Sequence, residues 1–536
     1  MLKPWSITTT VRNPERLKEF LVVLQHLAGQ KWDNENQKNY QKLLIKHRLY
    51  GYGSPQFYNG LSKNVVDLIN DTDTLIDDKT IERIITLKNY KDFAMRGRQS
   101  LNPLTKFGFA YIDNGIAQIT ELGNKLIENS QDFGDVFLKS FIKWQIPNPA
   151  NDDFANDGNY EIVPFVATLK LIDEVNKLEI TRGNNPVGLS KREFALFAPS
   201  LVKYSDISKY ADAVIKFRNL QKGKADIERK KARDEYRQQF VKEVLGAEKQ
   251  SDIDKLLDNL HDYGDNTIRY FRLTKFICIR GNGFYVDLEP NRRTEIEALF
   301  ENEFYKPKSF DNKETYLNYM SDDSLPVLPW QTKNKLVRIA KQVANDVLVI
   351  QKELGLKELI LQDVSEMDKN KLNSYVSDLR EERKSLQEKK NHIQSQSIEA
   401  IEQYIEQLEN IYSFENRALM LEYITTLGLH ALNDAKEIKP NYPVGDDNEP
   451  ASTATGGVAD IECYYENFNM ICEVTMLNGR DQWFNEGQPV MRHLRNFENI
   501  NKNAYCVFIA PSIHSDSAET FWIANTIGYK GNKQKI

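Results

Sequence analysis

The chain has 536 residues, of which 40% are hydrophobic, and its formal net charge is −6 at pH 7. This composition is typical of a folded protein with roughly three to four domains, and it excludes a histone-like polycation. No apolar run approaches the ~18 residues that span a membrane. The four cysteines lack the spacing of a disulfide framework or a zinc site. We therefore expect a protein of a reducing cytoplasm with no membrane partner.

The charge is distributed unevenly along the chain. Residues 1–300 carry 45 Lys and Arg against 41 Asp and Glu, whereas residues 301–536 carry 26 against 36. The first part is therefore better suited to binding a polyanion, although many neutral enzymes show a similar drift.

The first 150 residues are predicted to combine helices with short strands. Leucine and phenylalanine at helical spacing predict an amphipathic helix over 14–27. Apolar-rich runs within 109–120 flank Asn114 and Gly115, and Asn-Gly is the strongest short hairpin signal. A helix over 121–127 is expected to follow.

The same order recurs later in the chain. Runs at 274–280 and 284–288 surround a glycine-containing turn, and a helix is predicted over 294–300. Helices, a β-hairpin wing and a further helix are typical of winged-helix DNA-binding domains. Two unrelated hairpins would explain the pattern equally well. The candidate DNA contacts beside the two wings are Arg96, Arg98, Lys106, Lys275 and Arg280.

Residues 356–427 contain neither Gly nor Pro, which favours long helices that connect two functional halves. One helical stripe consists of Ile398, Ile401, Ile405, Leu408 and Ile411. A dimerising coiled coil is the alternative, but sustained heptads are lacking. Residues 433–457 contain several Pro and Gly and are predicted to form a loop.

The residues that point to chemistry lie in a predicted hairpin over 457–475. Asp460 opens its first strand, and Glu473 interrupts an otherwise apolar second strand. Because a buried carboxylate needs a partner or a metal ion, pairing of the strands would create a site. Two carboxylates and the carbonyl of Val474 form an oxygen-ligand set suited to Mg²⁺. The alternative is two exposed carboxylates, since Asp and Glu at this spacing are common.

The segments around the hairpin contain further candidates. Glu422 lies among apolar neighbours and also needs a partner. Glu486 and His493 are seven residues apart, so a helix would place them on one face. Pro489 is expected in the first turn of that helix, with Glu486 near its N-cap. Gln482 is expected to have mainly a polar structural role.

The order of helix, strand, strand, helix and strand is that of the PD-(D/E)xK nuclease fold, with Thr475 where Lys usually stands. Six segments carry a resemblance to a known family: SITTTVRNPE at 6–15, DVFLKSFIKWQIP at 135–147, AD at 459–460, EVT at 473–475, PVMRH at 489–493 and FIAP at 508–511. On these segments the chain resembles the AlwI family of type IIS restriction endonucleases, which includes BstNBI-type nicking enzymes.

The resemblance implies a multidomain α+β protein with a winged-helix-like DNA-recognition half, a helical linker and an α/β PD-(D/E)xK-like nuclease domain. The corresponding ranges are 1–150 and 151–305 for recognition, 306–412 for the linker and 413–536 for cleavage. By position, the family's acidic cleavage residues fall on Glu422, Asp460, Glu473 and Glu486. His493 falls on a histidine beside the site, and Thr475 on the family's own replacement for Lys. Family cleavage domains continue further, so this domain is expected to be short at its C-terminus.

The implied activity is Mg²⁺-dependent hydrolysis of double-stranded DNA at a fixed distance outside a short asymmetric site. Glu422 or Glu486 would hold a second ion or orient water, and Arg480, Arg492 or His493 would stabilise the transition state. Cutting both strands would require a transient dimer or a second cleavage subunit; otherwise the product is a nick. A cognate DNA methyltransferase in a bacterial cytoplasm is also implied. The alternative function is a winged-helix DNA-binding regulator without cleavage activity.

Overall fold

The computed structural model describes residues 1–8, 11, 14, 16–50, 55–70, 76–128, 133–150, 158–222, 224–280, 285–414, 417–442, 454, 458–528 and 533–536. The turn of the second predicted wing, part of the N-terminal motif and Gly457 lie outside these residues. The chain divides into two compact units. The first comprises Met1–Ile277, Val286–Leu288 and Glu295–Pro329, and the second comprises Cys278–Tyr285, Glu289–Thr294 and Trp330–Ile536. A search of the described helices finds none with the length and apolar character needed to cross a membrane.

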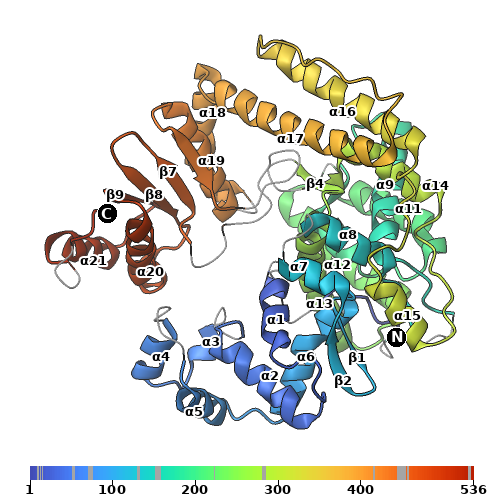
Figure 1. The fold of residues 1–536 in the computed structure, drawn as a ribbon, viewed down its shortest axis with the longest axis horizontal. Coiled ribbons are helices and arrows are strands. Elements are labelled where there is room, and N and C mark those ends of the chain that lie inside the picture. Colours follow the sequence, from blue (N-terminus) through green and yellow to red (C-terminus); the bar gives the residue numbers. More distant parts are fainter. Residues whose placement is uncertain are drawn as a thin grey trace. The chain divides into compact units, whose positions relative to one another are not determined.

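The first unit consists mainly of helices (Figure 1). They are α1 (Arg16–Gln25), α2 (Asn34–Lys46), α3 (Pro55–Tyr58), α4 (Lys63–Asn70), α5 (Asp78–Lys88), α6 (Phe93–Lys106), α7 (Glu121–Glu128), α8 (Phe133–Lys143), α9 (Pro164–Thr181), α10 (Lys191–Phe197), α11 (Ile207–Gln221), α12 (Asp226–Leu245), α13 (Gln250–Arg272) and α15 (Lys313–Ser321).

The first predicted hairpin is confirmed. Strand β1 (Ala110–Asp113) pairs antiparallel with β2 (Ile116–Ile119), and the last pair of the ladder is Asp113 with Ile116. The two-residue turn has left-handed φ angles of 47° at Asn114 and 77° at Gly115, as a type I′ turn requires. Helix α7 follows at once, as predicted, whereas the winged-helix assignment stays a prediction.

The strands and the helix of the second predicted wing are also present. Strands β4 (Ile277–Arg280) and β5 (Tyr285–Leu288) belong to a three-stranded sheet whose order is β3-β5-β4, with β3 at Leu189–Ser190. Helix α14 (Arg293–Glu301) follows. The third strand comes from a distant part of the chain, which the sequence pattern did not indicate.

Aromatic side chains form the centre of the first unit. Phe107 lies 5.2 Å from Phe141, 6.0 Å from Phe137 and 5.7 Å from Tyr270, measured between ring centroids. Phe137 and Phe141 belong to the 135–147 motif and are fully buried. Edge-to-face packing of this kind adds to the hydrophobic stabilisation of a core. These two residues of the motif therefore contribute to the core of the fold.

The second unit begins with long helices. Its helices are α16 (Lys333–Glu353), α17 (Lys369–Gln394), α18 (Ile398–Glu409), α19 (Arg417–Leu432), α20 (Gly479–Ile500) and α21 (Ser515–Thr526). The predicted helices within 356–427 are confirmed from Lys369 onward, whereas residues 356–368 form no helix. Helices α16 and α17 pack through Val347, Ile350 and Leu386. That they link two functional halves stays a prediction.

A four-stranded sheet with the order β6-β7-β8-β9 completes the second unit (Figure 1). The strands are β6 (Glu437–Pro440), β7 (Ile461–Tyr464), β8 (Asn469–Val474) and β9 (Ala504–Ile509). Strand β7 runs antiparallel to both β6 and β8, and β9 runs parallel to β8. Helix α19 packs on one face, and α20 and α21 pack on the other. The predicted helix, two strands, helix and strand are present as α19, β7, β8, α20 and β9, with β6 as an additional strand between α19 and β7.

Two local predictions in this unit were wrong. The predicted loop 433–457 contains β6, an edge strand ending in Pro440. Edge strands tolerate Pro because one side of the ladder is unpaired. Helix α20 begins at Gly479, so Pro489 lies in its interior and not in its first turn. The helix tolerates Pro489 at the cost of one backbone hydrogen bond.

Candidate active site

The sheet places the two candidate carboxylates opposite each other. Side chains along β8 point alternately to the two faces of the sheet, so that Ile471 packs against α20 while Cys472 packs against α19. Glu473 therefore points to the α20 face. The ladder pairs Ile461 with Cys472, and one step beyond this pair Asp460 lies opposite Glu473. The predicted juxtaposition of these two carboxylates is thus present in the strand register.

Asp460 is tied to the end of β8. Its Oδ2 accepts a hydrogen bond of 2.7 Å from the backbone N–H of Val474. This contact fixes the carboxylate beside the strand that carries Glu473. The role of the Val474 carbonyl as a metal ligand stays a prediction.

Helix α20 contributes two further side chains. His493 Nδ1 lies 2.8 Å from Glu473 Oε1; Glu473 is buried and His493 is partly buried. The other ring nitrogen, Nε2, is buried and has no hydrogen-bond partner among the described residues. Glu486 accepts a hydrogen bond from the Thr475 side chain, and its charge acts on both Asp460 and His493. The prediction that Glu486 and His493 share a helix face agrees with these interactions.

Glu422 reaches the site from α19 and is buried. Its Oε2 accepts a hydrogen bond of 3.0 Å from the backbone N–H of Ala454. The charges of Asp460 and Glu473 both act on this carboxyl, which places the three groups in one electrostatic cluster. Ala454 could not be predicted from the sequence, because a backbone donor has no side-chain signature.

Burial and mutual repulsion disfavour the charged forms of these carboxyls. Burial and then the charge of Asp460 raise the pKa of Glu422 to about 8. Burial and then the charge of Glu473 raise the pKa of Asp460 to about 7. Burial and then the charge of Glu486 raise the pKa of Glu473 to about 9, and burial also raises the pKa of Glu486. Burial and Arg492 lower the pKa of His493 to about 4. A cation bound between these carboxyls would favour their charged forms and lower their pKa values.

Gln482 has the structural role that the sequence predicted. Its side chain is fully buried, and Nε2 donates to the carbonyls of Leu477 and Ser512 at 2.9 and 2.8 Å. Its Oε1 accepts a hydrogen bond of 2.8 Å from the backbone N–H of His514. Gln482 thus joins the segment after β8 to the segment after β9, beside the carboxylate cluster.

The donor set fits a hard divalent cation. In the described parts of the chain, no three His, Cys, Asp or Glu side chains already form a metal-binding group. The carboxyls nevertheless interact electrostatically across strands β7 and β8, and carboxylate oxygens are the preferred ligands of Mg²⁺. The unpartnered Nε2 of His493 adds a buried polar atom that lacks a hydrogen bond in this structure.

The candidate DNA contacts do not form one cluster. Arg96, Arg98 and Lys106 all belong to α6. Arg98 pairs with Asp92 at 3.0 Å, and Lys106 Nζ donates to the carbonyls of Ser6 and Ile7 at 3.0 and 2.8 Å. Lys106 therefore holds the N-terminal segment.

The remaining two candidates flank or end a strand. Lys275 is half-buried just before β4, and Arg280 is exposed at the end of that strand. Their role in binding DNA stays a prediction.

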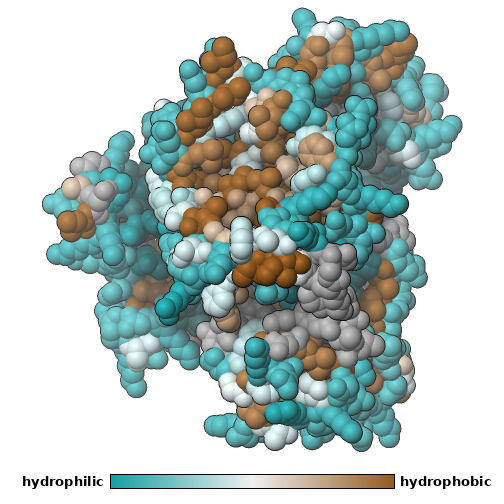
Figure 2. All heavy atoms as spheres, turned by 90° about the vertical axis from the view of Figure 1, so that its left-hand side faces the viewer, coloured by the Kyte–Doolittle hydropathy of each residue, from teal (hydrophilic) through white to brown (hydrophobic). Residues whose placement is uncertain are grey.

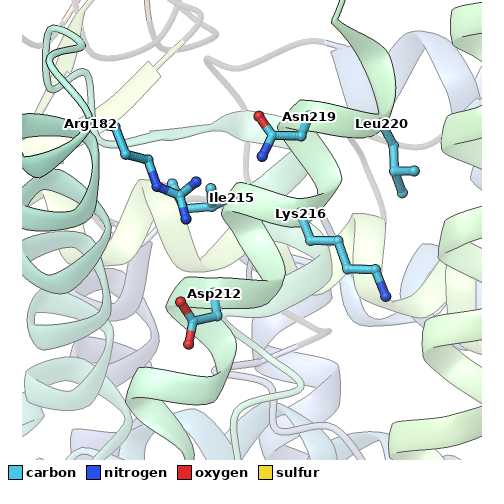
Figure 3. A pocket seen from close by; sticks show the side chains of 6 residues that line it. All are labelled: Arg182, Asp212, Ile215, Lys216, Asn219 and Leu220. Carbon is cyan, nitrogen blue, oxygen red and sulfur yellow. The ribbon is translucent and has the colours of Figure 1, made fainter.

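The first unit also has an open hollow of about 360 Å³ between the end of α9 and α11. Figure 3 shows its charged and amide side chains, which are mostly exposed. It is lined by Arg182, Asp212, Ile215, Lys216, Asn219 and Leu220. Its lining residues belong to the first unit, whereas the residues of the carboxylate cluster belong to the second unit.

The solved structures that match this chain include two restriction-enzyme chains. The small subunit (R.BspD6I2) of the heterodimeric restriction endonuclease R.BspD6I is 26% identical, covering 25% of this chain and 68% of that one, with a TM-score of 0.22. The BpuJ1 endonuclease binding domain, in complex with pyrene- and phenanthrene-modified DNA, is 14% identical. That match covers 59% of this chain and 96% of the other, with a TM-score of 0.29.

Both TM-scores are low, so neither structure supports an argument about this fold. No curated protein sequence matches the chain. The model of the AlwI restriction endonuclease family, in contrast, matches residues 105–536, which is most of the chain. The chain belongs to the AlwI family of restriction endonucleases.

Proposed function

We propose that the chain is a type IIS restriction endonuclease that hydrolyses DNA with Mg²⁺ at the carboxylate cluster of the second unit. The observation that carries this proposal is the cluster of buried Glu422 and Glu473 with partly buried Asp460, whose pKa values are raised to about 7–9. Such a set is costly to the fold unless a cation binds there. Family membership supplies the reaction class.

Asp460 and Glu473 would hold Mg²⁺, together with the carbonyl of Val474. When bound, Mg²⁺ polarises the phosphate oxygens and neutralises the charge that develops on them. His493 fixes Glu473 through its 2.8 Å contact, so the carboxylate keeps one orientation. The Thr475 hydroxyl holds Glu486, which would orient the attacking water or a second ion. Because residue 475 is not Lys, transition-state charge would be stabilised by Arg480, Arg492 or His493.

Residues 1–150 and 151–305 would recognise a short asymmetric DNA sequence, and 306–412 would link them to the cleavage domain at 413–536. Such a division agrees with the excess of positive charge in the first 300 residues. One cleavage centre cuts one strand, so the chain alone would nick. Double-strand cleavage would require a transient dimer or a second cleavage subunit, and a cognate methyltransferase would protect host DNA in the bacterial cytoplasm.

The test is incubation of supercoiled plasmid with the full chain in Mg²⁺ or EDTA, beside Asp460→Asn. We expect discrete nicked or linear products in Mg²⁺ and none with EDTA or the variant. Asp481→Asn, a change in the first turn of the same helix that bears Glu486, is the matched control and should cleave normally. Specific DNA binding without cleavage by the unmodified chain would instead support the DNA-binding regulator.

A further inference from the structure

Helix α18 exposes a continuous stripe of large aliphatic side chains. Ile398 is 72% exposed, Ile401 36%, Ile405 53% and Leu408 40%, and none of the residues of α18 is buried. Figure 2 shows one face of the molecule, on which hydrophobic side chains gather in a broad patch. Scattered exposed leucines are ordinary, but an aligned row of four indicates an interaction surface.

The spacing of the stripe is that of a helix that packs against another helix. The steps of three, four and three residues are heptad positions a, d, a and d. Tyr404, at the g position beside the stripe, packs against the core beneath α19, so that side of the helix is already in use. The four stripe residues are exposed and do not belong to this core.

The charge of α18 determines which partner fits. The helix carries Glu399, Glu402, Glu406 and Glu409, all exposed, and no Lys or Arg. Glu402 and Glu409 occupy the e positions that flank the stripe. A second copy of α18 would bring four further glutamates and no basic residue to the contact, which is electrostatically unfavourable. The occupant must instead supply positive charge along its flank.

We propose that the α18 stripe is the docking face for an amphipathic helix of a separate partner chain, with aliphatic residues at a and d and Lys or Arg at the flanking positions. The aliphatic row supplies the area to be buried, and the two flanking glutamates select a basic partner and fix its register. This inference does not depend on the nuclease proposal, because neither the stripe nor its glutamates belong to the carboxylate cluster.

The probe is a synthetic peptide of about three heptads with Ile at a, Leu at d and Lys at e and g, titrated into the full chain by fluorescence anisotropy. A counterpart peptide with Glu at e and g has the same apolar face. We expect the Lys peptide to bind at least about tenfold more tightly than the Glu peptide. Equal binding of the two peptides, or no binding of either, overturns the proposal.

Variants locate the binding site. Ile401→Ser with Ile405→Ser should weaken the Lys peptide at least about tenfold, whereas Gln403→Ala, exposed on the far side of the same helix, should not change binding. Glu402→Lys with Glu409→Lys should reverse the preference between the peptides. Circular dichroism melting verifies that each variant folds. A dimer of the unmodified chain that the double serine variant abolishes would show that a second copy is the occupant, and would overturn the proposal.

Discussion

Each unit of the protein buries a cluster of carboxylates, but the two clusters are balanced in opposite ways. In the first unit, Glu179 and Glu193 surround Arg218, which contacts them at 3.0 and 2.8 Å. Arg218 Nε makes a second contact of 2.9 Å with Glu193, so this pair is bidentate. In the second unit, Asp460 and Glu473 face each other across two strands, and their pKa values rise to about 7 and 9.

The difference separates a structural cluster from a functional one. A guanidinium matched to two carboxylates satisfies the charges that burial has removed from water. Carboxylates that repel one another lower stability, and such perturbed groups concentrate at functional sites. The second cluster is therefore expected to gain its balancing charge from a bound cation, and the first is expected to need none.

Glu473→Gln should give the largest effect on activity. The substitution removes a proposed metal ligand, so Mg²⁺-dependent cleavage should fall by more than the roughly 100-fold loss typical of a residue that only supports a ligand. It also removes a carboxyl that is ionised in the unfolded chain but must take up a proton on folding at pH 8, so the metal-free protein should gain about 1–3 kcal/mol in unfolding free energy. Plasmid cleavage and urea unfolding in EDTA measure the two effects. Lower stability of this variant in EDTA would contradict the view that the buried carboxyls destabilise the metal-free protein.

Arg218→Met should give the largest effect on stability. Its removal leaves two buried carboxylates unpaired, which typically costs about 3–5 kcal/mol. Urea unfolding of the full chain measures this loss. The matched control combines Arg218→Met with Glu179→Gln and Glu193→Gln, and should recover most of the stability because no charge is then left buried. If the single variant were as stable as the parent protein, the ion pairs of Arg218 would not contribute to stability.

Much of the second cluster could be predicted from the sequence because its signals are local. Alternation along the strands and a short turn between them place Asp460 opposite Glu473, and a seven-residue spacing puts Glu486 and His493 on one helix face. The first cluster gave no such signal. Arg218 reaches residues 25 and 39 positions earlier, so its partners depend on how whole helices pack.

The failures of prediction also have physical causes. Strand β6 contains Lys439 and Pro440, which argue against a central strand but are tolerated at a sheet edge. The start of α20 was misplaced because Pro489 favours a first helical turn. Its actual start has Asn478 at the N-cap with no side-chain cap bond, so the usual signal is missing.

The pH dependence of stability should distinguish the metal-free and Mg²⁺-bound forms. In the unfolded chain, carboxyls ionise near pH 4, whereas the folded pKa values of Asp460, Glu422 and Glu473 are about 7, 8 and 9. Between these limits the folded state binds more protons, so stability in EDTA should fall as the pH rises from 5 to 9. The pKa of His493, lowered to about 4, acts oppositely and reduces stability below about pH 6.5.

Mg²⁺ should counter the loss at high pH, because it binds the ionised carboxylates and displaces their protons. Thermal melting from pH 5 to 9, with EDTA or Mg²⁺, measures both curves. We expect the gain in melting temperature from Mg²⁺ to be larger at pH 8 than at pH 6, and to disappear in Glu473→Gln. If the gain in melting temperature did not depend on pH, Mg²⁺ would bind at a site other than the carboxylate cluster.

Ser190→Ala should give the smallest effect, and it tests how the first cluster is held. Ser190 and Glu193 form a capping box at α10, in which Ser190 N–H donates to Glu193 Oε2 at 2.8 Å. Removing the hydroxyl cap should cost about 1 kcal/mol in urea unfolding and leave cleavage unchanged. Asn312→Ala, in the exposed capping box of α15, should cost a similar amount. Because Glu193 also binds Arg218, only Ser190→Ala should be non-additive with Arg218→Met in a double-mutant cycle. Additivity of both caps would mean that the capping box and the ion pair hold Glu193 independently.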